Sequence, residues 1–216
     1  DFWHKQGRYV MDEEMSKGAA VFVPSRNPNF RGYLMGSYYD VSQTTGKPMR
    51  EPEPLTEGSE RLNAAFAALL DTAPVGFIEN TGLEVPVRYN ERECILEINT
   101  GYSTLEVFAA LATEISFARL HDRGMNRDYD RGAFQLNAES VGFMVCRRFG
   151  VDCPVPDAAG VQQFYSYYSP DDRGKSLDFM RQTARNMGDT VERGIQPRQQ
   201  EHTASRGSNN RQYGRR

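Results

Sequence analysis

The sequence has few cysteines. Cys94, Cys146 and Cys153 are the three in 216 residues, and no two of them form a Cys-x-x-Cys pair. A disulfide framework needs an even set of cysteines, and a cysteine zinc site needs closely spaced pairs. The pattern therefore argues against both and indicates a reducing cytoplasm.

Long apolar runs and excess positive charge are also missing. No stretch approaches the about 18 consecutive apolar residues of a membrane-spanning helix. The chain begins Asp-Phe-Trp-His, without Met or a basic leader, so we expect no signal peptide and a piece of a longer protein. The formal net charge is −3, so no overall positive field indicates nucleic-acid binding.

The common catalytic motifs are absent too. There is no Gly-x-Ser-x-Gly nucleophile turn, no Gly-x-x-x-x-Gly-Lys phosphate loop and no dinucleotide fingerprint. Cys146 lies beside Arg147 and Arg148 at the edge of an apolar helical stripe, where a buried, unreactive thiol is expected.

Apolar periodicity and turn residues predict alternating strands and helices. The expected strands lie within 18–25, 32–48, 83–90 and 93–99, and the expected helices over 59–73, 103–121, 133–150 and 171–195. This order predicts an α+β fold, with a small β-rich N-terminal region packed with a hairpin or short sheet and two to three helices. We expect boundaries at 1–56, 57–195 and 196–216, the last being a disordered, Arg-rich tail or linker.

The predicted helix 103–121 has the frame of a zinc-protease helix. Ser103 and Glu106 form a capping box at its start. A catalytic zinc helix has the pattern His-Glu-x-x-His, in which two imidazoles one turn apart bind the ion and the Glu acts on the bound water. Here Glu114 keeps the Glu position, but Thr113 and Phe117 stand where the two His belong.

These substitutions argue against a bound metal. Thr is a poor zinc ligand and Phe is none, and a site from Glu114, His121 and Glu139 would span about two helical turns. We therefore expect Glu114 to pair with an arginine such as Arg119 or Arg131. Glu139 is expected to be a partly exposed helix carboxylate, or the third-ligand position of an ancestral site.

The first 50 residues interleave aromatic and basic side chains. Aromatic rings can stack on bases while basic groups contact phosphates, as single-strand binding requires. The same rings could instead serve strand packing. The candidate DNA-binding residues are Trp3, Arg8, Lys17, Arg26, Arg31, Tyr33 and Lys47.

Four stretches together resemble the ArdC-type antirestriction proteins. "GRYVMDEEMSKGAAVFVP" (7–24) and "YYDVSQTTGKPM" (38–49) are similar to that family's N-terminal region. "ECILEINTGYSTLEVFAALATEISFARLH" (93–121) and "AFQLNAESVGFMVCRRFGVD" (133–152) are similar to its zincin-type metallopeptidase half. The resemblance covers roughly residues 3 to 195.

The resemblance implies a region that binds single-stranded DNA and a zinc metallopeptidase domain, in a bacterial cytoplasmic protein of plasmids and other mobile elements. This sequence departs from the family at Thr113 and Phe117, and at Phe134 and Gln135, where acidic residues are often found. We therefore expect a pseudo-metallopeptidase with no cofactor and no metal.

Three functions follow as hypotheses. The first is a non-catalytic ArdC-like module that binds single-stranded DNA in antirestriction or DNA transfer. The second is a metallopeptidase with unusual ligands. The third is an interaction scaffold that contacts other domains of a larger conjugation protein. No membrane partner is expected.

Overall fold

The structure is a computed structural model that describes residues 2–25, 27, 29, 33–49, 53–157 and 160–196. It divides the chain into two compact units, Asp1–Glu51 and Pro52–Arg216. Leu55 belongs to the second unit, because it is buried there and its N–H donates to Phe149 O at 3.0 Å. The tail from 197 onward, which the sequence predicts to be disordered, lies outside the described residues. No helix in the described ranges is both long enough and apolar enough to cross a membrane.

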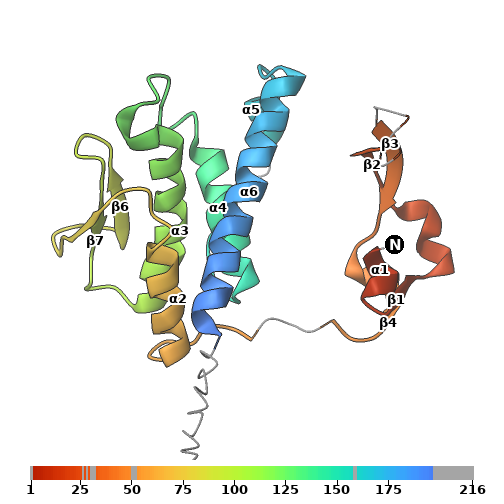
Figure 1. The fold of residues 1–216 in the computed structure, drawn as a ribbon, viewed down its shortest axis with the longest axis horizontal. Helices are drawn as coiled ribbons and strands as arrows, with labels where there is room; N and C mark the ends of the chain where they lie inside the picture. Colours follow the sequence, from red (N-terminus) through yellow and green to blue (C-terminus); the bar gives the residue numbers. More distant parts are fainter. Residues whose placement is uncertain are drawn as a thin grey trace, which may run out of the picture. The chain divides into compact units, whose positions relative to one another are not determined.

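The first unit consists of two small antiparallel ribbons and short helical turns (Figure 1). β1 (Arg8–Val10) pairs with β4 (Thr44–Gly46), and β2 (Ala19–Pro24) pairs with β3 (Tyr33–Tyr38). The connecting turns are α1 (Phe2–Lys5) and the 3-10 helices η1 (Asp12–Lys17) and η2 (Val41–Gln43).

Polar contacts connect the short elements of this unit. Asp40 caps η2 with Gln43 in a reciprocal capping box, and Tyr39 OH donates to Met15 O at 2.8 Å. Among the described residues of the unit only Thr44 is buried. The apolar side chains whose burial is described in this unit are all at least partly exposed, and such limited burial offsets little of the conformational entropy of folding.

The second unit is a short mixed sheet packed on helices. Its elements are α2 (Glu60–Leu70), β5 (Phe77–Glu79), β6 (Val87–Asn90), β7 (Ile95–Ile98), α3 (Thr104–His121), the 3-10 helix η3 (Asp122–Gly124), α4 (Gln135–Arg148), α5 (Val161–Tyr165) and α6 (Pro170–Ile195). The strand order is β5-β7-β6, with β5 parallel and β6 antiparallel to β7. The α+β fold class is thus confirmed, although the sequence did not predict β5, whose three residues are too few for a periodic signal.

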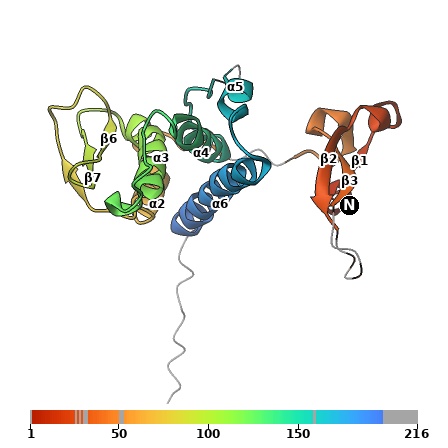
Figure 2. The same cartoon turned by 90° about the horizontal axis from the view of Figure 1, so that it is seen from above.

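Helix α3 is central to the second unit. Figure 2 shows it between the strands on one side and α4 and α6 on the other. Its flanks are therefore both covered: Phe108, Leu111 and Ile115 are fully buried, and Phe117 on the far side of that stripe is 3% exposed. The predicted Ser103–Glu106 capping box is present.

Two close contacts fix α4 against its neighbours. Gly142 lies against Thr113 of α3, where an added Cβ would be 2.1 Å from Thr113 Oγ1. On the other side, Arg148 of α4 forms ion pairs with Asp189 (2.7 Å) and Glu192 (2.9 Å) of α6. The first contact requires the small residue Gly142, and the second requires the long side chain of Arg148. The helical pattern of apolar residues does not predict either contact.

Candidate functional site

The Glu114 carboxylate lies in a cleft and has partners for both oxygens. Oε1 accepts from Arg131 Nη2 at 2.5 Å, and Oε2 accepts from the Tyr89 backbone N–H of β6 at 2.7 Å. The residue is 8% exposed. A buried carboxylate needs such partners to remain charged. The expected pairing of Glu114 with an arginine is confirmed, and the arginine is Arg131, because Arg119 Nη2 donates to Thr72 O instead.

Arg131 reaches the site from the loop before α4. Its guanidinium carbon lies 3.9 Å from the centroid of the Phe117 ring, while Nη2 binds Glu114. Burial opposes the charged form, but the hydrogen bond and charge of Glu114 outweigh it and hold the pKa of Arg131 above its usual value. Nη1 is buried without a hydrogen-bond partner. The three residues form one compact cluster, which we call the Glu114–Phe117–Arg131 cluster.

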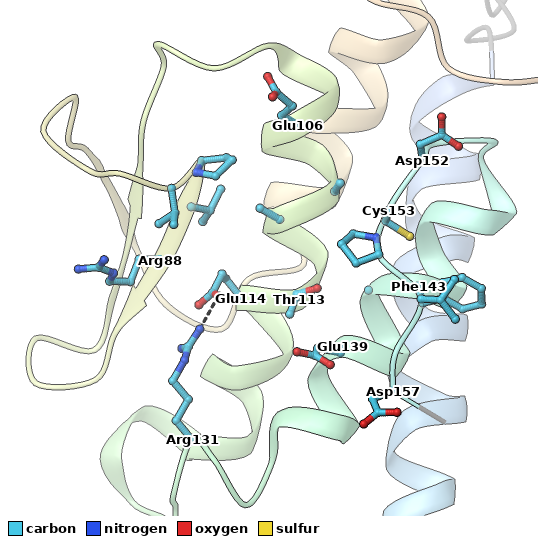
Figure 3. A pocket seen from close by; sticks show the side chains of 18 residues that line it. Arg88, Glu106, Thr113, Glu114, Arg131, Glu139, Phe143, Asp152, Cys153 and Asp157 are labelled. Atoms are coloured by element: carbon cyan, nitrogen blue, oxygen red, sulfur yellow. Dashed lines mark hydrogen bonds and ion pairs between the residues drawn. The ribbon is translucent and has the colours of Figure 1, made fainter. Parts of the chain in front are cut away.

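The cleft has a volume of about 740 Å³. Figure 3 shows Thr113 on α3 directed toward α4, which carries Glu139, while Glu114 points toward the strand side and Arg131 reaches it from below. Glu139 is half-buried, and its Oε1 accepts from Gln135 Nε2 at 2.7 Å. Three positions of the degenerate motif, Thr113, Glu114 and Glu139, therefore line one cleft, whereas Phe117 is buried beside it under Arg131.

The cleft is acidic. Its lining contains five carboxylates and two guanidinium groups, from Glu106, Glu114, Glu139, Asp152 and Asp157 and from Arg88 and Arg131. A cleft of this sign repels a phosphate backbone. We therefore expect any nucleic acid to bind elsewhere on the protein.

The side chains present do not fit a metal ion. Thr113 offers a weak ligand and Phe117 none, and the guanidinium of Arg131 takes up one Glu114 oxygen. Within the described ranges no group of three His, Cys, Asp or Glu residues is arranged to hold an ion.

His121 does not join the Glu114 site. Its Nδ1 is hydrogen-bonded to Tyr89 OH at 2.8 Å, and its ring stacks on Tyr129 with centroids 4.4 Å apart. Desolvation raises the pKa of both tyrosines. The ring cluster closes the end of α3 against β6 and is a packing feature.

The candidate DNA-binding residues of the first unit differ in their surroundings. Arg8 connects β1 to the 41–47 segment through hydrogen bonds. Its Nε donates to Thr44 Oγ1 (2.8 Å) and its Nη1 to Lys47 O (2.5 Å). Its Nη2 donates to Thr44 O (2.6 Å) and Val41 O (3.3 Å). Lys17 is ion-paired with Glu14 at 2.6 Å.

The remaining candidates are more open, or lie partly outside the description. Lys47 is exposed, and Trp3 is half-buried with its ring edge-on to Phe2 at 5.0 Å. Tyr33 is the first residue of β3, and nothing is described of its side chain. Arg26 and Arg31 lie outside the described residues. The assignment of these side chains to DNA stays a prediction.

Two features of the sites were not selected from the sequence. The sequence indicates at position 117 only that a metal ligand is absent, whereas in the structure the Phe117 ring contacts the Arg131 guanidinium, and a pairing over 14 residues leaves no local sequence signal. Tyr9 and Tyr38 were not chosen as candidates, yet they are 57% and 58% exposed. The alternation of polar and apolar residues can place these tyrosines on strands, but it does not predict that their rings are exposed.

No protein-family model and no curated protein matches this chain. Among solved structures, it is similar to the crystal structure of the antirestriction ArdC protein from plasmid R388 with Mn(II) bound, at 20% identity and a TM-score of 0.50, over 91% of this chain and 78% of that one. The metal-free structure of the same protein has 18% identity and a TM-score of 0.49, over 89% and 74%. At this identity the first likeness establishes the fold, and the ArdC-like fold that the motifs predict is confirmed.

Proposed function

We propose that this chain is a non-catalytic ArdC-like module of a plasmid or conjugative element, which binds single-stranded DNA through its first unit in an antirestriction or DNA-transfer context. The fold shared with ArdC from plasmid R388 supports the family context. The acidic cleft and the missing ligands in the second unit support a role without metal-dependent hydrolysis.

The observation that carries the proposal is the exposed surface of the first unit. Cross-strand partners in an antiparallel ribbon share a face. The register therefore places Val21, Leu34 and Tyr38 on one face of the β2–β3 ribbon, and all three are exposed, at 42%, 52% and 58%. An exposed aromatic ring beside apolar side chains is a surface on which unpaired bases can stack.

Few of the basic side chains described in the first unit are left for phosphate contacts. Arg8 and Lys17 are engaged within the unit, whereas Lys5 and Lys47 form no ion pair with any described residue. Two phosphate contacts on a single strand give a slope of log affinity against log salt of about −1.4. With these two lysines alone, stacking would contribute more than charge, and phosphate contacts by Arg26 and Arg31, which lie outside the described residues, would make the slope steeper.

The test is a fluorescence-anisotropy titration of a labelled single-stranded oligonucleotide with the whole chain at two salt concentrations. Tyr38→Ala should weaken binding by about 5- to 100-fold, because it removes one stacked ring. Tyr167→Ala is the matched control, since Tyr167 is an aromatic residue of the second unit that is 92% exposed. A chain truncated after Ile195 reports the contribution of the Arg-rich tail.

The result would contradict the proposal if the wild-type chain does not bind at low salt, or if both tyrosine variants lose the same affinity. Binding that disappears with the tail would move the site off the first unit.

A protein-interaction scaffold remains the second candidate. Met35 is 68% exposed on the face of the ribbon opposite Leu34, so apolar side chains project from both faces. Apolar exposure on two faces fits a protein partner, such as another domain of a larger mobile-element protein, better than a nucleic-acid strand. Absence of DNA binding together with self-association or partner binding through this ribbon would favour the scaffold.

A further inference from the structure

The Glu114–Phe117–Arg131 cluster places a positive charge beside positions 114 and 117, which in a zinc-protease helix carry the general base and the second imidazole. Position 117 is where the second imidazole would face the ion, and the guanidinium carbon lies 3.9 Å from the ring centroid of the Phe found there. Arg131 Nη2 is 2.5 Å from the Glu114 carboxylate that would otherwise act beside the ion.

We propose that Arg131 is the resident cation of this site: its guanidinium takes the place of the metal ion and keeps metal out. This inference does not depend on DNA binding by the first unit. It concerns the second unit alone and can succeed or fail independently.

The chemistry of the three side chains supports this assignment. A guanidinium is a planar cation that stacks on an aromatic face and binds carboxylate oxygens through its edge. Phe117, which cannot bind a metal, is therefore a suitable partner for Arg131. Phe117 and Arg131 together therefore make an alternative site for a single positive charge.

Arg131 also joins the walls of the cleft as a bound ion would. Glu114 binds Arg131 through Oε1 and the Tyr89 N–H of β6 through Oε2. The pair thereby connects α3, the loop before α4 and the strand β6. With the guanidinium in place, a divalent cation beside Glu114 would meet like charge at contact distance.

The test restores the ligands with and without the arginine. Thr113→His/Phe117→His supplies two imidazoles, and Glu139 across the cleft completes a two-His, one-Glu ligand set. The same pair with Arg131→Ala removes the resident cation. Bound Zn²⁺ per chain is measured on desalted protein, and affinity is measured by calorimetry with zinc chloride. Melting temperature with and without Zn²⁺ is followed for each variant.

We expect the triple variant to bind one Zn²⁺ per chain at least about 100-fold more tightly than the double variant, because a unit charge at contact distance is removed. Adding Glu139→Gln to the triple variant should weaken binding at least about tenfold, since a carboxylate ligand is lost. Three outcomes overturn the proposal: equal affinity of the double and triple variants, no Zn²⁺ binding by a folded triple variant, or one equivalent of zinc or manganese retained by the wild-type chain.

A second measurement needs no metal and no new histidine. Arg131→Ala leaves the Glu114 carboxylate buried without its cation, so Glu114→Gln/Arg131→Ala should melt at a higher temperature than Arg131→Ala alone. A purely steric role for Arg131 would not produce this recovery. If the double variant is no more stable than Arg131→Ala, Arg131 does not act as the counter-charge and the proposal fails.

Discussion

The contact between Thr113 and Gly142 yields a prediction in which one substitution has opposite signs in two backgrounds. Gly142 is inside α4, where replacement by Ala would by itself stabilise the helix by about 1 kcal/mol. An added Cβ, however, would lie 2.1 Å from Thr113 Oγ1. Overpacking of this kind costs about 1–3 kcal/mol, so we expect Gly142→Ala to be destabilising overall, by about 1 kcal/mol.

Removing the hydroxyl reverses the expectation. In a Thr113→Ala variant, the atoms nearest the new Cβ of residue 142 are Cβ and N of residue 113, at 3.3 and 3.4 Å. The two helices can accommodate these contacts with a small shift. Gly142→Ala should then stabilise by about 0.5–1 kcal/mol, as helix propensity alone predicts.

The assay is urea unfolding followed by circular dichroism, for the wild type, both single variants and the double variant. Gly174→Ala is the matched control, because Gly174 is also inside a helix but has no atom within 4 Å of its added Cβ. It should stabilise in either background. If Gly142→Ala has the same effect with Thr and with Ala at 113, the close approach of α3 and α4 at this point is not real.

Three further predictions concern the second unit. Leu111→Ala should lower the free energy of unfolding by about 3–4 kcal/mol in urea melts, because Leu111 is fully buried and its loss leaves a cavity; a loss under about 1 kcal/mol would place α3 at a surface. The hydrogen bond from Arg148 lowers the pKa of Asp189 below its usual 3.8, so its contribution to stability is present above that value and is lost as pH falls through the lower, folded pKa. Arg148→Met should therefore make the drop in melting temperature between about pH 5 and pH 3 smaller, and an unchanged drop would exclude this pair as its source. Burial raises the pKa of the Cys146 thiol and removes it from solvent, so a thiol reagent at pH 8 should label Cys146 only after unfolding; labelling of Cys146 at the native rate of Cys94 would contradict its burial.

The structure changes the meaning of the degenerate motif. Thr113 and Phe117 looked in the sequence like two separate losses at a metal site. In the fold, Thr113 contacts Gly142 of the next helix, and Phe117 supports Arg131 from a loop 14 residues away in sequence. Each of the two residues therefore has a packing partner of its own.

The sequence by itself determined the features that depend on neighbouring residues. The Ser103–Glu106 capping box fixes the start of α3, and Ser59 caps α2 as its side-chain oxygen and spacing predict. The absence of metal ligands at 113 and 117 is likewise a matter of side-chain chemistry, and the burial of Cys146 follows from its place on an apolar stripe.

Only the tertiary structure decided which distant groups meet. Arg119 lies closer to Glu114 along the helix, yet its guanidinium binds Thr72 O, and Arg131 binds the carboxylate. The Arg8 guanidinium likewise donates to carbonyls of the 41–47 segment, 33 to 39 residues away in sequence. Many such pairings are chemically equivalent, so helical periodicity and composition cannot predict which of them forms. The packing of the whole unit brings one pair of groups within hydrogen-bond distance.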